Sequence, residues 1–543
     1  MDRSDDVIVG PAFAPDSAAD CLSGDWDIGL NACFECCDRH AAVDADRPAI
    51  YFEDEGRSSV TTFGELRARS TAFAGLLTRL GVQPGDCVAA LVPRSPELVV
   101  AALGAWRIGA IFMPLFTAFG EAAIGHRLQQ ANAAVLIVDE AYLSSVEGID
   151  NRPPSILISN FGCSCSTTES WDQMVAAATL SEPIMLDREA PFLRMFTSGT
   201  TGKPKSLDVP LRALVAFAVY MREGIDLQQA DRFWNLADPG WAYGLYYALI
   251  GPLLLGIPTV FSKQAFDPYL AIEIIRRLKI TSLAGSPTAF RLLMKAGPDA
   301  VRPIRKQLRV VSSAGEPLTP EVSNWFREHL GVDVRDHYGQ TELGIVLVSR
   351  TMPEDLASQP KGSTPISGFS LAVLDEAGGE LGPGAVGELA VHRTASPLFW
   401  FAGYRERKAL SDSYYRTGDL VQWNSEGGIL FIGRTDDVIT SSGYRIGPFD
   451  VESALAEHAK VLEVGVIGKT DVQRTEIVKA FVVLMPDVDA TNDLIEELKQ
   501  HVRKRLSAHA YPREIEFIDR LPRTPSGKLQ RHVLKGVDNK RSQ

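Results

Sequence analysis

The chain has 543 residues, more than one hydrophobic core usually organises, so the sequence predicts at least two domains. Apolar residues make up 45% of the chain and charged residues 23%, which is typical of a folded globular protein and excludes a largely disordered one. The formal net charge of -13 argues against a nucleic-acid partner, because phosphate backbones are bound by basic surfaces.

Three features bear on compartment. The N-terminus, MDRSDDVIVG, has no basic region followed by an apolar run, so no signal peptide is predicted and we expect a cytoplasmic protein. The uncharged segment 243–261 has the length of a membrane helix, but three glycines and two prolines interrupt it; we interpret it as a helix and strand of a large core. Seven cysteines, an odd number, suit a reducing compartment, and the CxxC pair Cys33 and Cys36 lacks two further ligands at recognisable spacing for a metal.

The first 140 residues alternate helix and strand patterns. A helix is predicted over 61–81, where Thr62 and Glu65 form a capping box ahead of apolar residues at helical spacing. The pattern continues with a strand over 87–93, a helix over 96–109, and strands over 110–115 and 135–140. Such alternation predicts parallel sheets with helices on both faces and ligands at the carboxyl ends of the strands.

The pattern changes after about residue 370, where Gly-Pro turns separate short strands and predict a small β subdomain. Past Arg434 the sequence predicts strands over 462–468 and 477–485 and an amphipathic helix over 493–506. We therefore predict an α/β protein with a large N-terminal domain, 1–434, of parallel α/β subdomains plus the small β subdomain. A small mobile α+β C-terminal domain, 435–543, follows it.

A run of hydroxyl and glycine residues, FTSGTTGKPK at 196–205, is suited to binding phosphate. It is not a Walker P-loop, because two residues instead of four separate Gly199 from Gly202, and Pro204 follows Lys203. By itself the run fits a phosphate loop and a flexible surface turn equally well.

Six motifs occur in one order along the chain: TSGTTGKPK (197–205), AGEP (314–317), HYGQTELG (337–344), YRTGDL (415–420), GRTDDVITSSGYRIGPFDVE (433–452) and PRTPSGKLQR (522–531). With them the chain, from about residue 30 onward, resembles the adenylate-forming superfamily of acyl-CoA synthetases, peptide-synthetase adenylation domains and luciferases. The stretches SSGYRIGPFDVE, IVKAFVVL and YPREIEF resemble the short- and medium-chain acyl-CoA synthetases within it.

The resemblance implies an AMP-forming carboxylic acid-CoA ligase that uses ATP, Mg²⁺ and CoA and whose partners are small molecules; it leaves the oligomeric state open. Bringing a carboxylate to the α-phosphate of ATP joins two anions, so cations and fixed donors must neutralise charge. The residues that the resemblance assigns to this chemistry are Lys528, Thr341, Glu342 and Arg445, with Glu342 holding Mg²⁺.

The resemblance also implies a nucleotide and CoA site, in which Asp419 accepts hydrogen bonds from the two ribose hydroxyls. The residues expected to contact ATP or CoA are Thr197, Ser198, Gly199, Thr200, Thr201, Gly202, Lys203, Lys205, Gly315, Glu316, Pro317, Asp336, His337, Tyr338, Gly339, Gln340, Asp419, Arg434, Ser442, Gly443, Tyr444 and Arg474. Lys528 is expected to serve the adenylation step and then to leave, by a domain rotation about the hinge Asp436, so that the CoA thiol can enter.

Of the expected substrates, the carboxylic acid is the one that the sequence determines least. Acetyl-CoA synthetases have Trp where this chain has Gly339, so we expect a larger pocket and a short- to medium-chain or aromatic acid, with Trp241, Tyr243 and Tyr246 as walls. The alternatives are an acetate-CoA ligase, transfer of the acyl group to a carrier protein, and a non-catalytic sensor. The presence of Lys528, Glu342 and Asp419 counts against a sensor.

Overall fold

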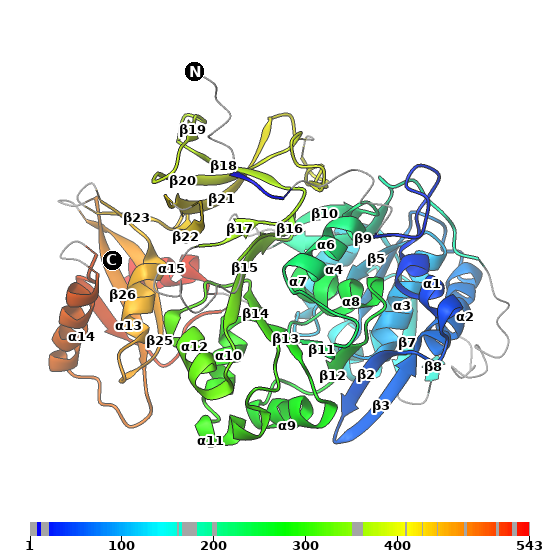
Figure 1. Cartoon of the computed structure of the whole chain (residues 1–543), viewed down its shortest axis with the longest axis horizontal. Helices are drawn as coiled ribbons and strands as arrows, with labels where there is room; N and C mark the ends of the chain where they lie inside the picture. The colour runs from blue at the N-terminus through cyan, green and yellow to red at the C-terminus, as the bar shows by residue number, and fades with distance from the viewer. Residues whose placement is uncertain are drawn as a thin grey trace.

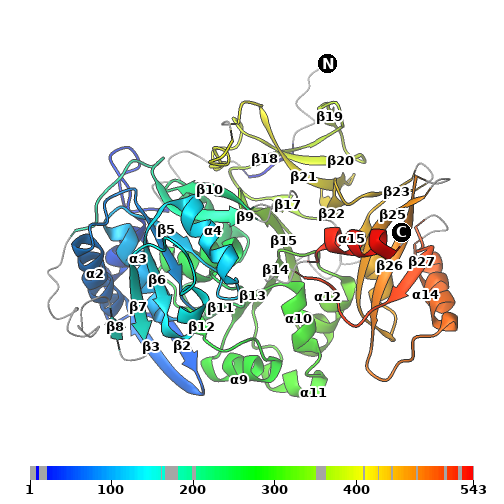
Figure 2. The same cartoon turned by 180° about the vertical axis from the view of Figure 1, so that it is seen from behind.

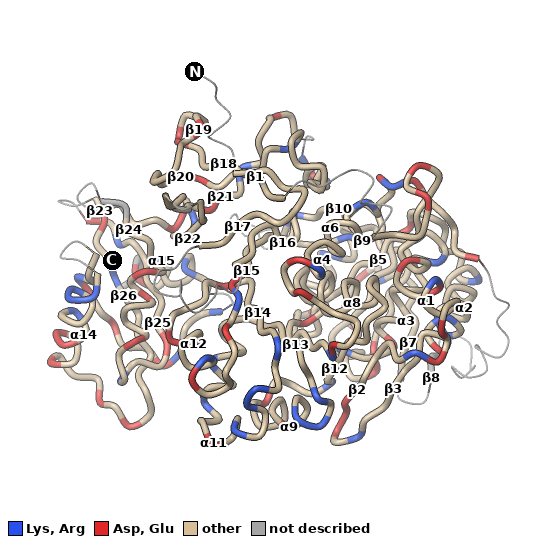
Figure 3. The backbone as a smooth tube through the Cα atoms, viewed as in Figure 1, with Lys and Arg blue, Asp and Glu red and all other residues tan. Residues whose placement is uncertain are grey.

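The computed structural model describes most of the chain. The residues outside its description are 1–7, 12–20, 160–161, 165–181, 198–203, 350–361, 408–409, 426, 442–443, 472–474, 507–509, 524–528 and 542–543. Within the described residues the strands form four sheets (Figure 1, Figure 2). Figure 3 shows that acidic and basic residues are interspersed along the elements of these sheets.

A seven-stranded sheet, with strand order β10-β9-β5-β4-β6-β7-β8, forms the first α/β unit. Its elements are β4 (Cys87–Leu91), β5 (Ile111–Pro114), β6 (Ala133–Asp139), β7 (Ser155–Ser159), β8 (Gly162–Ser164), β9 (Pro191–Thr197) and β10 (Lys205–Pro210), with α2 (Phe63–Arg79), α3 (Pro96–Arg107) and α4 (Glu121–Ala131). The strands from β9 to β7 are parallel, and the two edge strands are antiparallel. Val88 and Ala90 pack with α2 and α3, whereas Ala89 and Leu91 pack with α4, so helices cover both faces as predicted.

The predicted capping box starts α2. The side chain of Thr62 accepts a hydrogen bond from the backbone N–H of Glu65 at 3.2 Å, and the Glu65 carboxylate accepts one from the backbone N–H of Thr62 at 2.9 Å. Two backbone donors at the helix start are thereby satisfied, and this prediction is confirmed.

A nine-stranded sheet, with strand order β17-β16-β15-β14-β13-β11-β12-β2-β3, lies in the middle of the molecule (Figure 1). Its elements are β2 (Pro48–Asp54), β3 (Arg57–Thr62), β11 (Phe233–Asn235), β12 (Thr259–Ser262), β13 (Ser282–Gly285), β14 (Val310–Ala314), β15 (Val334–Gln340), β16 (Gly344–Val348) and β17 (Thr364–Pro365), with α6 (Ala213–Glu223), α9 (Pro268–Leu278), α10 (Pro287–Met294) and α12 (Pro320–Trp325). Leu283 and Val311 pack with α9, α10 and α12, whereas Ala284 and Ala314 belong to the core that contains α6. The strands from β15 to β2 are parallel, so their carboxyl ends share one edge.

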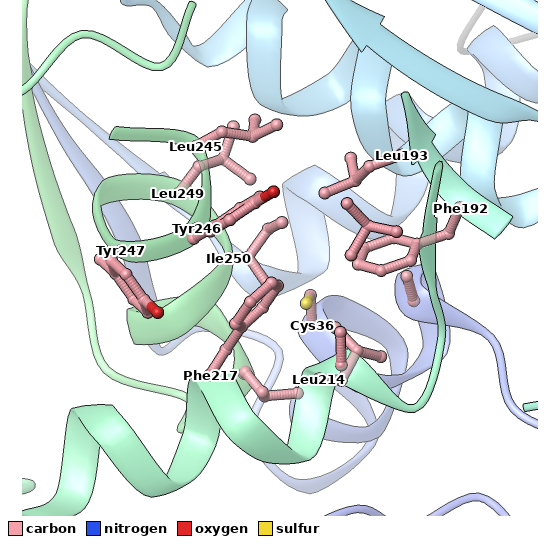
Figure 4. Packing of buried hydrophobic residues seen from close by; sticks show 14 of the residues in the cluster. Cys36, Phe192, Leu193, Leu214, Phe217, Leu245, Tyr246, Tyr247, Leu249 and Ile250 are labelled. Carbon is pink, nitrogen blue, oxygen red and sulfur yellow. The ribbon is translucent and has the colours of Figure 1, made fainter. Parts of the chain in front are cut away.

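The uncharged segment 243–261 forms a helical run and a strand, as predicted. The run comprises α7 (Ala242–Gly244), η4 (Leu245–Ile250) and α8 (Gly251–Leu254), and β12 follows it. Figure 4 shows Tyr246 and Ile250 of this run beside Phe217 of α6 in the buried core. Among the described residues, no helix is long and apolar enough to cross a membrane.

The predicted β subdomain is an antiparallel sheet of β1 (Ile8–Val9), β18 (Ser370–Leu374), β19 (Glu380–Leu381), β20 (Val386–His392), β21 (Tyr414–Trp423) and β22 (Ile429–Arg434). The pairing of β1 with β18 was not predicted, because a two-residue strand has no periodicity to recognise. This sheet, yellow in Figure 1, lies beside the edge of the nine-stranded sheet that carries β16 and β17.

The C-terminal unit, orange and red in Figure 1 and Figure 2, lies at one end of the molecule. It contains β23 (Ile439–Ser441), β24 (Tyr444–Ile446), β25 (Val461–Asp471), β26 (Thr475–Leu484) and β27 (Glu514–Phe517), with α13 (Pro448–Ala456), α14 (Asn492–Arg505) and α15 (Arg531–Arg541). Val478 and Val482 of β26 pack with α13 and α14, and Phe481 packs with Leu534 of α15 on the other face. The unit thus has its own core, while the domain boundary at 434/435 stays a prediction.

The described cysteines Cys21, Cys33, Cys36, Cys37 and Cys87 are buried, and no disulfide joins any two of them. Burial raises the pKa of the Cys33 thiol to about 12, so that thiol is protonated at neutral pH. Among the described residues, no group of three or more His, Cys, Asp or Glu side chains is placed to hold a metal ion.

Candidate active site

A carboxylate stands at the junction of two sheets. Asp419 of β21 and Arg434 of β22 are register partners, and Arg434 Nη1 donates to Asp419 Oδ1 at 3.2 Å. Asp419 is only 4% exposed, and the backbone N–H of Thr435 donates to the carbonyl of Gly418 at 2.9 Å. The YRTGDL and GRTDD motifs are therefore adjacent strands of one hairpin, which places their functional candidates side by side.

The second motif to reach this carboxylate comes from β15. The Tyr338 hydroxyl and Gln340 Nε2 donate to Asp419 Oδ2 at 2.5 and 2.7 Å. The Gln340 amide is oriented by two more partners, since Nε2 also donates to the carbonyl of Thr417 at 2.9 Å and the Tyr415 hydroxyl donates to Oε1 at 3.0 Å. Burial raises the pKa of the Asp419 carboxyl, and the Arg434 charge and these donors oppose that rise.

Glu342 lies at the turn between β15 and β16 and is 7% exposed. Its Oε1 accepts a hydrogen bond from the Tyr404 hydroxyl at 2.5 Å, and the Tyr246 hydroxyl donates to the carbonyl oxygen of Thr341 at 3.1 Å. The Lys205 ammonium lies 5.1 Å from the centre of the Tyr404 ring. Tyr404 thus joins the end of the glycine-rich stretch to Glu342; sequence reasoning missed it, because no motif marks this tyrosine.

The structure describes the stem of the glycine-rich stretch, that is, the paired strand residues at its two ends. Thr197 and Lys205 are register partners in the β9–β10 pair, whereas Ser198, Gly199, Thr200, Thr201, Gly202 and Lys203 lie outside the described residues. Just past the stem, the side chain and backbone N–H of Ser206 donate to Glu406, and the backbone N–H of Arg405 donates to the carbonyl of Ser206 at 3.0 Å. The segment 404–406 therefore holds one end of this stretch, a contact that the sequence did not indicate.

The AGEP motif follows β14 at the carboxyl edge of the nine-stranded sheet. Gly315 has φ +90°, which favours glycine, and its missing side chain faces open space. The Glu316 carboxylate is already engaged, since it accepts from Thr288 Oγ1 at 2.7 Å and from Arg291 at 3.3 Å on α10. Glu316 therefore holds the loop onto α10, and the direct nucleotide contact expected for it and for Pro317 stays a prediction.

Asp336 and His337 of β15 have different surroundings. The backbone N–H of Asp336 donates to the Ser349 hydroxyl at 2.6 Å, and burial raises the pKa of its carboxyl to about 7. His337 is 3% exposed, and its Nδ1 lies 2.8 Å from the Tyr220 hydroxyl of α6. His337 therefore points to the core side of the sheet, away from the Tyr338–Asp419 contact, and is not placed beside the other expected nucleotide residues.

Gly339 has no space beside it. A Cβ on Gly339 would lie 2.1 Å from the carbonyl oxygen of Gly344 and 2.7 Å from the Cα of Ile345. The strands approach this closely at an irregularity, where the β15–β16 register shifts between Tyr338 and Gly339. The expectation that the missing side chain at Gly339 opens an acid pocket does not hold in this packing, because the backbone of β16 fills that direction.

Replacing Gly339 by alanine is expected to lower the free energy of unfolding by about 1–3 kcal/mol, the usual cost of overpacking. Gly75 in the middle of α2 is a matched control, because its missing side chain meets no atom within 4 Å. Gly75→Ala should stabilise by up to about 1 kcal/mol. Thermal denaturation followed by circular dichroism would test both, and an unchanged midpoint for Gly339→Ala would contradict the packing argument.

The three aromatic candidates for an acid wall differ. Trp241 packs against Phe116 and Phe119 at ring distances of 5.2 and 5.5 Å, and Tyr243 is half-buried beside Tyr220. Tyr246 is fully buried and stacks on the Phe217 ring at 4.5 Å (Figure 4). Because the Tyr246 hydroxyl donates to the carbonyl oxygen of Thr341, Tyr246 positions the β15–β16 turn. Its side chain is therefore not available as a wall of the acid pocket.

The C-terminal candidates are only partly described. Lys528, Ser442, Gly443 and Arg474 lie outside the described residues, as do the side chains of Arg445 and Tyr444. The ends of the Lys528 segment are joined, since Arg523 and Leu529 form a β-bridge and the backbone N–H of Gln530 donates to the carbonyl of Pro522 at 2.9 Å.

Just after the Lys528 segment, Arg531 forms ion pairs with Glu452 and Asp437. Arg531 Nη2 bonds both Glu452 oxygens at 2.7 Å, and Nη1 lies 3.5 Å from Asp437, next to the predicted hinge Asp436. Burial opposes the charge on Arg531, but the neighbouring carboxylates outweigh it and raise the pKa of the guanidinium. On the N-terminal side of Asp436, Arg434 donates a hydrogen bond to Asp419. On its C-terminal side, Asp437 is paired with Arg531.

Two sheets of mainly parallel strands carry the buried Glu342 and the stem of the glycine-rich stretch, and the neighbouring antiparallel sheet supplies Asp419, which donors from β15 and β22 hold; these are the features of an adenylate-forming enzyme. Residues 37–404 match the AMP-binding enzyme family, and residues 450–528 match the AMP-binding enzyme C-terminal domain. The chain belongs to the AMP-binding enzyme family, in its acyl-CoA synthetase branch.

Similar proteins cover nearly the whole chain. The acetyl-coenzyme A synthetase of Bacillus subtilis is 37% identical over 517 residues, which are 93% of this chain and 90% of that protein. The crystal structure of a Brucella canis acyl-CoA synthetase is 49% identical, covers 98% of each chain and gives a TM-score of 0.77. An anthranilate CoA ligase in complex with anthranoyl-AMP is 26% identical, covers 96% of this chain and 98% of that chain, and gives a TM-score of 0.83.

Proposed function

We propose that the protein is an AMP-forming carboxylic acid-CoA ligase. In the first step a carboxylate oxygen attacks the α-phosphorus of ATP, and pyrophosphate leaves; in the second the CoA thiolate attacks the acyl carbonyl, and AMP leaves. The observation that carries this proposal is the convergence of Tyr338, Gln340 and Arg434 on Asp419, with Glu342 on the same β15–β16 turn. A buried carboxylate oriented by donors on both oxygens suits two neighbouring hydroxyls, such as those of a ribose.

Glu342 fits a magnesium site. Tyr404 engages one carboxylate oxygen, which orients the other. Magnesium in nucleotide enzymes is bound by one or two carboxylates together with phosphate oxygens and water, so a single glutamate beside the phosphates suffices. When bound, the ion would neutralise charge on the phosphates, and Thr341, Lys205 and the glycine-rich stretch would supply hydrogen-bond donors around them.

The two half-reactions need different groups in one place, because the thiol must enter where the Lys528 segment and pyrophosphate were. Arg434, before Asp436, is ion-paired with Asp419, and Asp437, after it, is ion-paired with Arg531. These ion pairs hold the chain on each side of Asp436, which supports Asp436 as the hinge. The proposal includes a cytoplasmic location, where ATP and CoA are both present.

A panel of carboxylic acids assayed for pyrophosphate exchange without CoA, and for thioester formation and AMP release with CoA, would test the proposal. We expect pyrophosphate exchange with at least one acid, and thioester formation with free CoA. Exchange without thioester would favour transfer to a carrier protein, and no exchange with any acid would contradict a ligase.

Acetate-CoA ligase is the second candidate. The backbone contact beside Gly339 removes the argument that this glycine enlarges the acid pocket, and a 37% identical relative is an acetyl-coenzyme A synthetase. Comparing kcat/KM for acetate with that for longer and aromatic acids separates the two candidates: a higher value for acetate supports an acetate-CoA ligase, and a higher value for the larger acids supports a ligase of short- to medium-chain or aromatic acids.

A further inference from the structure

Tyr404 contacts two separate parts of the candidate active site. Its hydroxyl donates to Glu342 Oε1 at 2.5 Å, across 62 residues of sequence. The Lys205 ammonium lies 5.1 Å from the centre of the Tyr404 ring, within the range of a cation–π interaction. One side chain therefore touches both the expected magnesium ligand and the stem of the glycine-rich stretch.

The Tyr404 hydroxyl is a donor at neutral pH. Burial, the charge of Glu342 and the hydrogen bond to Glu342 raise the pKa of this hydroxyl, whereas a hydrogen bond with the Thr197 side chain lowers it. The net shift is upward, so the hydroxyl stays protonated. Because Thr197 is the register partner of Lys205, the hydroxyl and the ring of Tyr404 reach the two ends of the same stem.

The backbone that follows Tyr404 is bound to this stem as well. The N–H of Arg405 donates to the carbonyl of Ser206 at 3.0 Å, and the backbone N–H of Ser206 donates to the Glu406 carboxylate at 3.3 Å. The Ser206 hydroxyl and Gln130 Nε2 of α4 donate to the same carboxylate. The tyrosine therefore lies on a segment that β10 and α4 hold in place.

These contacts bear on one half-reaction more than on the other. A hydrogen bond to one carboxylate oxygen of Glu342 fixes the direction in which the other oxygen can bind a cation. Groups that orient a metal ligand in this way contribute about 10- to 100-fold to metal affinity. Adenylation needs the magnesium ion and the donors around the phosphates together, whereas thioester formation follows after pyrophosphate has left.

We propose that Tyr404 is a positioning residue for the adenylation step: its hydroxyl orients Glu342 toward Mg²⁺ while its ring holds Lys205, so that metal ligand and phosphate-binding lysine keep a fixed separation. The inference rests on the proposed ligase function. It gives Tyr404 no part in the attack of the CoA thiolate on the acyl group.

Tyr404→Phe tests the inference, because it removes the hydroxyl and keeps the ring beside Lys205. We expect the free Mg²⁺ concentration for half-maximal pyrophosphate exchange to rise by about tenfold or more. Thioester formation from synthetic acyl-adenylate and CoA, measured in EDTA, should match the wild type.

Calorimetric titration with ATP, without acid, gives a second readout that does not depend on turnover. The ratio of the Kd for ATP in EDTA to the Kd in saturating Mg²⁺ should be about tenfold lower in Tyr404→Phe than in the wild type, because the metal gains less from the oriented carboxylate. The ratio is internal to each enzyme, so a lower yield of folded variant does not affect it.

Two further variants complete the test. Tyr414→Phe removes a hydroxyl that donates to Glu380 in the β subdomain, so it deletes the same type of hydrogen bond away from the site and should leave all three measurements unchanged. Tyr404→Leu removes both hydroxyl and ring. It should repeat the metal effect and also raise the KM for ATP at saturating Mg²⁺ by about two- to fivefold, the value of one partly exposed cation–π contact.

The outcomes separate the two proposals. An unchanged Mg²⁺ requirement in Tyr404→Phe, an equal loss in the thioester step, or the same effect in Tyr414→Phe would overturn the inference and leave the ligase function standing. A KM for ATP in Tyr404→Leu no higher than in Tyr404→Phe would overturn the part that concerns Lys205. No pyrophosphate exchange by the wild type with any acid would overturn both proposals.

Discussion

Lys528→Ala is expected to lose acyl-adenylate formation by about 100-fold or more, because one positioned cation or donor at developing charge is worth that much. Thioester formation from supplied acyl-adenylate should continue, since the lysine has left the site by then. The described ends of its segment support a positioned lysine: Arg523 and Leu529 are bridged, and Arg531 is held by Glu452 and Asp437.

Pyrophosphate exchange measures the first step, and thioester formation from synthetic acyl-adenylate and CoA measures the second. Lys504→Ala, at an exposed position in the last turn of α14, controls for the loss of one charge and should match the wild type in both assays. Equal losses in the two steps, or none in either, would remove Lys528 from the assigned role.

Asp419→Ala is expected to raise the KM for ATP by about 100-fold, because two hydrogen bonds to a charged acceptor are lost at once. A sharper readout is deoxy-ATP, which lacks one ribose hydroxyl. The wild type should discriminate against it, and the variant should not, because the acceptor that recognises the hydroxyl is gone.

Asp412→Ala is a matched control, since this aspartate is exposed in the loop before β21. It should keep both the KM for ATP and the discrimination against deoxy-ATP. If Asp419→Ala discriminated as strongly as the wild type, the carboxylate would not be the ribose acceptor, and its three donors would have a structural role alone.

Much of the secondary structure could be predicted, because local signals and tertiary packing agree. The capping box at Thr62 formed, β4 is buried on both faces, and the amphipathic pattern over 493–506 became α14 with Leu494, Leu498 and Val502 in the core. The motif residues Asp419, Arg434, Tyr338 and Gln340 also came together as expected.

What could not be predicted depends on contacts between distant segments. Tyr404 and Glu406 hold Glu342 and Ser206 across 62 and 200 residues, and neither belongs to a motif. The side to which His337 points and the closed space beside Gly339 depend on how β15 pairs with β14 and β16, which a linear pattern does not encode.

The sequence by itself determined the family, the order of the motifs and the α/β alternation, since these rest on residue types and spacings within short windows. The tertiary structure decided which side chains orient Asp419 and Glu342, and which face of β15 each motif residue occupies. The reason is physical: hydrogen-bond partners and strand register are set by pairing between remote strands, so they exist only once the sheets have formed.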